Sequence, residues 1–191
     1  MHKARIEAFS DGVIAIIITI MVLELKVPHS SDWQSLAALW PVFLSYVLSF
    51  IYIGIYWNNH HHLFQVVQKI EGSVLWANLH LLFWLSLIPF ATAWMGENHF
   101  SELTVAVYSF SMLMPAIAYT ILVKRLLKTH SKDTHLAKAI GSDSKGRLSL
   151  VLYGIAVGVA FWLPLFSLAL VVAVAIIWLI PDRRIERVIE S

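Results

Sequence analysis

Long apolar runs alternate with short polar segments along the chain, and six of these runs have the length and composition of membrane-spanning helices. A helix needs about 20 mostly apolar residues to cross a hydrocarbon layer of about 30 Å. The six predicted spans are residues 10–26, 36–57, 73–95, 103–123, 147–163 and 166–181. The pattern therefore predicts an all-α, polytopic membrane protein with six transmembrane helices per subunit, in which residues 1–191 form a single transmembrane domain.

The last two predicted spans share one apolar stretch, residues 148–180. As a single helix this stretch would be about 50 Å long, which is too long for one span. Because Pro164 breaks or bends a helix, we predict a tight turn at residues 163–167. The preceding residues 124–147 form the one long polar segment, which we predict to be a basic cytoplasmic linker, either helical or in contact with lipid headgroups.

The composition and the charge distribution fit a membrane protein and predict its orientation. Hydrophobic residues make up 59% of the chain and charged residues only 14%, whereas soluble domains are about half apolar and about a quarter charged. Six spans place both termini on one side, which then holds all but one, Lys26, of the 14 lysines and arginines. Because basic residues concentrate in cytoplasmic loops, we expect a multi-pass protein of the cell membrane with both termini in the cytoplasm.

Acidic residues gather on the opposite, outer side of the predicted membrane. They are Glu24, Asp32, Glu97 and Glu102. These carboxylates either attract cations to an outer vestibule or form an ordinary solvated loop surface, and the sequence leaves both interpretations open.

Several classes of function lack support in the sequence. The chain has no cysteine, which excludes disulfides, thiolate metal sites and cysteine nucleophiles. It has no nucleotide-binding, metalloprotease or serine hydrolase motif, and nothing in the linker resembles a nucleic-acid-binding motif. The potassium filter sequence TVGYG and the arginine ladder of a voltage sensor are also absent. We therefore predict no enzymatic activity, no cofactor and no nucleic-acid partner, and a channel would have to select ions by other means.

The histidine cluster of the chain is the run Asn-Asn-His-His-His at residues 58–62. Metal ligands on a helix share a face at a spacing of three or four residues, whereas consecutive residues point about 100° apart. We therefore predict a polar helix end at the cytoplasmic interface rather than a metal site.

The first predicted span opens with two polar residues, Ser10 and Asp11. They could cap the following helix, but residues 5–9 continue the helical pattern backwards without a breaker. A charge inside a membrane helix is usually paired or faces water, so we expect Asp11 to find its partner on another helix or another subunit. The candidate partners at the same membrane level are Trp57, His60, His61, Asn78 and His80.

The apolar part of the first span carries a stripe of branched residues. Ile16, Ile20 and Leu23 follow one another at helical spacing, and Thr19 is the hydroxyl residue nearest to them. Such a stripe commonly faces lipid or packs against other helices. Copies arranged around a symmetry axis would instead form a hydrophobic constriction, which can gate a pore by dewetting. The periodicity alone leaves both interpretations open.

The stretch from Arg5 to Asp11, RIEAFSD, matches the RxxxFSD signature of the lysosomal potassium channel family, transmembrane protein 175. With six predicted spans and cytoplasmic termini, the chain resembles one of the short prokaryotic members. The resemblance implies a non-classical channel architecture: a homotetramer in the lipid bilayer, with span one lining the pore and potassium as the permeant ion. It also implies that the signature residues Arg5, Phe9, Ser10 and Asp11 tie span one to its neighbours.

The same resemblance places particular residues in the pore. Ile16 lies five residues after the signature aspartate, as the pore-lining isoleucine of the family does, while Ile20 and Leu23 match hydrophobic positions further outward. Thr19 matches the threonine that follows this isoleucine in the family. The alternative function is a proton- or cation-coupled secondary transporter that uses Asp11 and the histidines as a relay.

Overall fold

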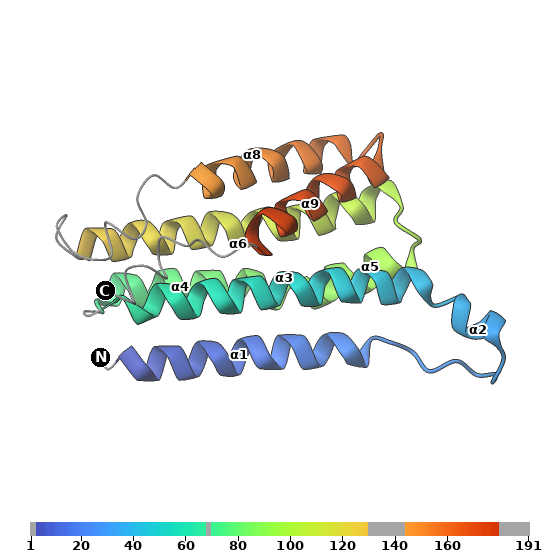
Figure 1. Cartoon of the computed structure of the whole chain (residues 1–191), viewed down its shortest axis with the longest axis horizontal. Helices are drawn as coiled ribbons and strands as arrows, with labels where there is room; N and C mark the ends of the chain where they lie inside the picture. Colours follow the sequence, from blue (N-terminus) through green and yellow to red (C-terminus); the bar gives the residue numbers. More distant parts are fainter. Residues whose placement is uncertain (1–2, 68–69, 130–143, 180–191) are drawn as a thin grey trace.

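The computed structural model describes residues 3–67, 70–129 and 144–179, whose long helices run roughly parallel or antiparallel to one another (Figure 1). The helices are α1 (Lys3–Leu23), α2 (Trp33–Ala37), α3 (Trp40–Gln65), α4 (Gly72–Ser86), α5 (Ile88–Glu97), α6 (Glu102–Thr129), α8 (Ser144–Val159) and α9 (Pro164–Leu179). The described residues contain no β-strand, so the all-α prediction is confirmed for them. We call the end of the bundle where α1 begins the N-terminal end, and the opposite end the α2 end.

Four helical stretches are long and apolar enough to cross a membrane, namely α1, α3, α6 and the pair α4–α5. They correspond to the first four predicted spans. α1 begins at Lys3 rather than at residue 10, and α3 continues to Gln65, through the histidine run. Hydropathy locates only the apolar part of a helix, whereas the backbone hydrogen bonds continue across the polar residues at its ends.

The last two predicted spans correspond to α8 and α9. Their described parts have 16 residues each, which is fewer than the about 20 residues of a usual span, so the six-span count stays a prediction. α8 ends at Val159 and α9 begins at Pro164, so the helix breaks slightly before the predicted turn at residues 163–167. The proline is the first residue of α9, where its missing N–H and fixed φ are tolerated.

The predicted linker at residues 124–147 is partly helical. Its first residues belong to α6, which runs to Thr129, and its last residues belong to α8, which begins at Ser144. The centre of the linker lies outside the described residues. So do six of the basic residues used to predict the orientation, namely Lys69, Lys132, Lys138, Arg183, Arg184 and Arg187.

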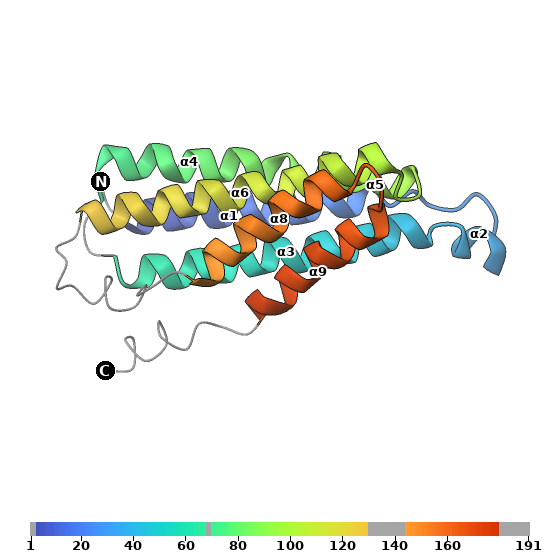
Figure 2. The ribbon, with the colours of Figure 1, turned by 90° about the horizontal axis from the view of Figure 1, so that it is seen from above.

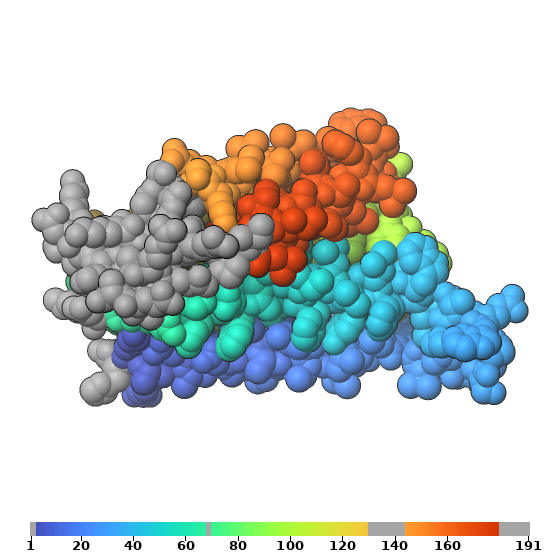
Figure 3. Space-filling view, in the orientation of Figure 1, coloured from blue at the N-terminus to red at the C-terminus, as the bar shows by residue number. Residues whose placement is uncertain are grey.

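α1 is an edge helix of the bundle. It packs against α3, α4 and α5, while α6 lies beyond α4 and the hairpin of α8 and α9 covers α6 and α3. Figure 2 shows α1 between α4 and α3, and in the space-filling view of Figure 3 it forms the lower edge, opposite α8. The residues of α1 that are buried recur every three or four positions and are Ile6, Ser10, Ile14, Ile17 and Met21. One face of α1 is therefore packed, and its other face is left free.

Hydroxyl groups link the helices inside the apolar core. Thr92 donates to the carbonyl of Ile88, so Ser49 donates to Thr92 over 2.7 Å, and Tyr108 donates in turn to Ser49 over 3.0 Å. Tyr153 donates to the hydroxyl of Tyr52, which donates to a carbonyl of α9. In the part of the chain that the structure describes, no buried side-chain nitrogen or oxygen lacks a partner. These bonds hold helices together where lipid offers no hydrophobic driving force.

The contact between α5 and α3 requires a glycine. A Cβ atom built on Gly96 would lie 2.7 Å from the Cα of Val42 and 3.1 Å from Oγ of Ser45. Real Cβ atoms do not approach backbone that closely, so any side chain at Gly96 would push α5 away from α3. The contact fixes the α2 end of α5.

Candidate functional site

Ser10 joins α1 to two other helices through a buried chain of hydrogen bonds. The side-chain nitrogen of Asn78 donates to Oγ of Ser10 over 2.9 Å, and the oxygen of Asn78 lies 2.8 Å from Nε2 of His60. Because the Asn78 nitrogen faces Ser10, its oxygen is the acceptor and Nε2 of His60 carries the proton. All three side chains are almost fully buried. We call this chain the Ser10–Asn78–His60 network, and it connects α1, α4 and α3.

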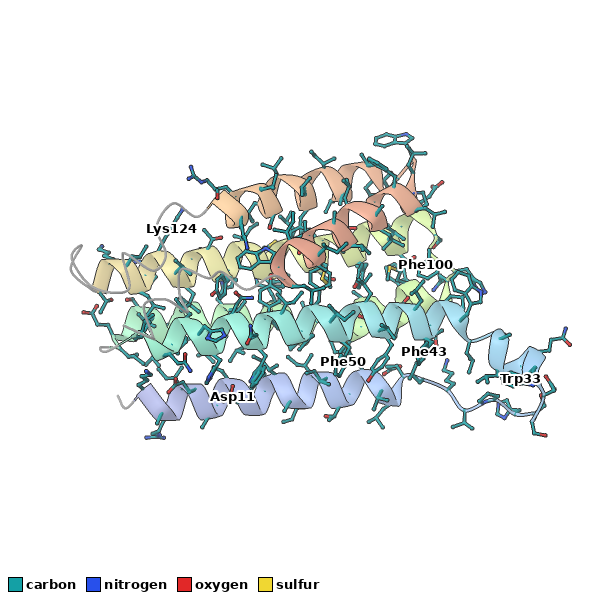
Figure 4. All side chains as sticks on the ribbon, in the orientation of Figure 1. Asp11, Trp33, Phe43, Phe50, Phe100 and Lys124 are labelled. Atoms are coloured by element: carbon teal, nitrogen blue, oxygen red, sulfur yellow. The ribbon has the colours of Figure 1, made fainter. Side chains whose placement is uncertain are left out.

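Asp11 makes a second link between α1 and α3. Its Oδ1 accepts a hydrogen bond of 3.1 Å from Nε1 of Trp57. The ring of Trp57 stacks on His61, with the ring centroids 6.0 Å apart and the planes inclined by 16°. Figure 4 shows Asp11 on the N-terminal half of α1. The carboxylate is thus held at the periphery of the bundle by an indole that itself has a stacked neighbour.

The other predicted members of this region lie elsewhere. His80 accepts a hydrogen bond of 2.8 Å from Trp84, one turn along α4, so it is engaged within its own helix. Arg5 and Phe9 are exposed on α1, and the described residues offer neither of them a hydrogen bond or an ion pair. Of the four signature residues, Ser10 and Asp11 are therefore hydrogen-bonded to other helices, whereas Arg5 and Phe9 face outwards.

The histidine run forms no metal site in the part of the chain that the structure describes. His60 belongs to the Ser10–Asn78–His60 network, while His61 accepts a hydrogen bond from Gln65 and His62 lies 3.4 Å from the Gln65 oxygen. No group of three histidine, aspartate or glutamate side chains comes together among these residues.

The predicted stripe on α1 lies on the free face of that helix. Ile16 is 58% exposed, Ile20 42% and Leu23 78%, whereas Ile17 and Met21 on the packed face of α1 are buried. Thr19 is exposed beside the stripe. Its hydroxyl donates to the carbonyls of the preceding turn, 2.9 Å from that of Ile16, which leaves the oxygen lone pairs free to face outwards.

A groove of about 470 Å³ runs beside this stripe, between α1 and the α4–α5 pair. On the α1 side it is lined by Val13, Ile16, Ile17, Ile20 and Glu24, and on the other side by Ser86, Pro89, Phe90 and Ala93. The second wall was not predicted from the sequence. Pro89, near the start of α5, is the one sequence feature that could have indicated this wall, because a proline interrupts the backbone hydrogen bonds between α4 and α5.

Charged residues mark the α2 end of the groove. Lys26 forms an ion pair with Glu97, and the hydrogen bond to this carboxylate raises the pKa of the Lys26 ammonium. Asp32 accepts hydrogen bonds from Ser30 and from the backbone of Ser35, which lower the pKa of its carboxyl group. Asp32 thereby caps α2, while Glu24 is exposed at the mouth of the groove.

The chain is similar to known membrane channels in sequence and in fold. The family described as "Endosomal/lysosomal potassium channel TMEM175" matches residues 5–89. A protein of a Chryseobacterium species named as a potassium channel is 55% identical over 187 residues, covering 98% of this chain and 97% of that protein. A second one, from Streptomyces collinus, is 36% identical over 171 residues, covering 84% and 83% of the two chains.

The crystal structure of a homologue from Chamaesiphon minutus, described as a lysosomal potassium-selective channel TMEM175 homologue, has the same fold. The two structures superpose with a TM-score of 0.82 at 32% sequence identity, covering 94% of this chain and 97% of the other. The likeness therefore extends over nearly the whole chain.

Proposed function

The chain belongs to the TMEM175 channel family, and from this membership we propose that it forms a potassium-permeable cation channel lined by α1 of several copies. The observation that carries the proposal is the division of α1 into two faces. Ile17 and Met21 are buried in the bundle, while Ile16, Ile20 and Leu23 are exposed over two turns. Relatives that are named as potassium channels support a pore rather than a lipid-facing role for this stripe.

Several copies are needed because one chain offers only one wall of a pore. α1 lies at the edge of its bundle, so a symmetric ring of subunits can bring the free faces of the α1 helices together around one axis. We propose four subunits, as the family resemblance implies. Each subunit then spans the membrane six times, with α8 and α9 as the last two spans and both termini in the cytoplasm of a cell-membrane protein.

The proposed pore is mostly apolar. Rings of Ile16, Ile20 and Leu23 leave little room for water, so an ion must give up part of its hydration shell at the narrowest ring. Potassium is hydrated more weakly than sodium, so this step favours potassium. The lone pairs of Thr19 replace some of the lost water, and Glu24 at the outer mouth raises the local cation concentration. Selectivity of this kind is modest, because the pore lacks a cage of backbone carbonyls.

The polar start of α1 sets the rotation of the pore helix. The Ser10–Asn78–His60 network and the bond from Trp57 to Asp11 attach α1 to two other helices at one level. A rotation of α1 by one residue, about 100°, would break these bonds and turn the stripe away from the axis. Buried polar bonds of this kind are strong in a low-dielectric interior, which suits them to fixing one orientation.

Ion flux in liposomes tests the proposal. The protein is reconstituted with potassium inside, and the flux of potassium is compared with that of sodium in the wild type and in Ile16→Asn. An asparagine ring wets the constriction, so we expect cation flux to rise severalfold and the preference for potassium to fall. The matched control is Ile176→Asn, since Ile176 is 57% exposed on α9, far from α1, and its replacement leaves the flux unchanged.

Three outcomes contradict parts of the proposal. The absence of cation flux contradicts the channel, and an unchanged flux in Ile16→Asn contradicts the assignment of the stripe. Flux that saturates and shows counterflow indicates the transporter instead, because a pore passes unitary currents. The mass of the detergent-solubilised protein, corrected for detergent, tests the number of subunits.

A further inference from the structure

α6 is longer than the hydrocarbon layer of a membrane. Its 28 residues from Glu102 to Thr129 correspond to about 42 Å of helix, some 12 Å more than a hydrocarbon layer of about 30 Å. α6 starts at the α2 end with the charged Glu102. With this residue at one edge of the hydrocarbon, the last two turns of α6 extend beyond the other edge, at the level of the lipid headgroups.

These last turns carry three exposed basic side chains. Lys124, Arg125 and Lys128 lie on one face of α6, about 100° wide, while Leu122 and Leu126 on the opposite face are fully buried. Figure 4 shows Lys124 on α6 at the N-terminal end of the bundle. Among the described residues no carboxylate lies within 4 Å of any of the three, so no acidic side chain in this part of the chain pairs with them.

The basic face continues an apolar face of the same helix. Leu103 and Phe110 are exposed on α6, and helical geometry places them at the same angle around the axis as Lys128. One stripe of α6 is therefore apolar at the depth of the acyl chains and basic at the depth of the headgroups. This change along a single face is what a lipid molecule, with an apolar tail and a charged head, would contact.

Two other uses of the charges fit the structure less well. A cation near the last carbonyls stabilises a helix C-terminus, but Lys128 alone is in the last turn and suffices for that. The three charges also do not line the mouth of the proposed pore. α6 packs against α4, α5, α8 and α9, and Figure 1 shows α1 on the other side of α4.

We propose that Lys124, Arg125 and Lys128 bind the phosphate groups of anionic phospholipids in the adjacent leaflet. The guanidinium of Arg125 suits two-point binding of a phosphate, and the lysines supply flanking point charges. Each basic residue at an anionic surface strengthens binding about fivefold. The leaflet is the cytoplasmic one if the proposed orientation holds, but the binding itself does not depend on the channel function.

Electron paramagnetic resonance of spin-labelled lipids tests the proposal on the purified full-length protein. The association of labelled phosphatidylglycerol relative to labelled phosphatidylcholine is measured for the wild type, for K124Q/R125Q/K128Q and for the charge-preserving K124R/R125K/K128R. We expect the preference for phosphatidylglycerol to fall at least tenfold in the glutamine variant and to persist in the charge-preserving one. Lys26→Gln, which removes a paired charge at the α2 end, leaves the preference unchanged.

Two results overturn the proposal. One is an unchanged preference in the glutamine variant, and the other is an equal loss in both triple variants, which would exclude a role of charge. If the triple variant does not fold, Lys124→Gln and Lys128→Gln separately replace it, with an expected fall of about fivefold each. Because lipid association is measured instead of flux, failure here is distinct from failure of the proposed channel function.

Discussion

Replacement of Asn78 by leucine removes the residue that joins α1 to α3 and α4. Asn78 is 2% exposed, and leucine has the same branched arrangement of four side-chain heavy atoms with a somewhat larger volume, so the change creates no cavity. It leaves Nε2–H of His60 and Oγ of Ser10 buried without a partner. An orphaned polar group costs about 1–3 kcal/mol in soluble proteins, whereas a hydrogen bond in a membrane protein contributes about 0.6 kcal/mol on average. We therefore expect a loss of about 1–4 kcal/mol in the free energy of unfolding.

The loss is measured by unfolding the protein in mixed micelles with increasing sodium dodecyl sulfate, followed by circular dichroism. Ser86→Leu is the matched control, because Ser86 is an exposed polar residue of the same helix whose hydroxyl donates to the carbonyl of Phe83, one turn earlier in that helix. A double-mutant cycle of Ser10→Ala and Asn78→Ala isolates one bond and should give a coupling of about 0.6–1.7 kcal/mol. A loss in Asn78→Leu no larger than that in Ser86→Leu would refute the reasoning.

Two further predictions concern helix contacts. Gly96→Ala brings a Cβ to 2.7 Å from the Val42 backbone. We therefore expect a loss of about 1–3 kcal/mol in the free energy of unfolding, measured by the same titration. An unchanged free energy of unfolding would show that α5 can move away from α3 without cost. Trp57→Phe keeps the stacking on His61 but removes the bond to Asp11, so we expect α1 to loosen and liposome flux to change while stability falls by only about 1 kcal/mol. Equal flux would contradict a role of Asp11 in holding α1.

The sequence predicted the helices well because apolar length is a local property. The runs that defined the first four spans lie mostly in helices of the bundle, although residues 24–26 follow the end of α1 and residues 38–39 lie between α2 and α3. The membrane character follows from composition alone. The ends of the helices were predicted less well. α3 passes through the polar residues 58–62 to Gln65, since intact backbone hydrogen bonds, rather than side-chain polarity, determine where a helix stops.

From the sequence, the depth of residues in the membrane limits the candidate partners of Ser10 and Asp11 to a few side chains, but it does not identify which of them form the bonds. Asn78 and His80 both lie near the start of α4, two residues apart and therefore about 200° apart around the helix. Only the packing of α4 determines which of them faces α1. In this packing Asn78 points inwards and bonds to Ser10, while His80 accepts a hydrogen bond from Trp84. The second wall of the groove escaped prediction for the same reason, because it depends on the rotation of α5.

The position of α1 between unlike neighbours constrains how copies can assemble. α3 lies on one flank of α1 and the α4–α5 pair on the other (Figure 2). In a ring with every α1 facing the axis, each contact between subunits therefore joins two different surfaces. Such a head-to-tail contact closes only when the rotation from one copy to the next divides the circle evenly. In such a ring, a substitution beside α1 occurs once in every subunit. In assemblies that mix wild-type and variant subunits, the effect on the pore therefore increases with the number of variant subunits.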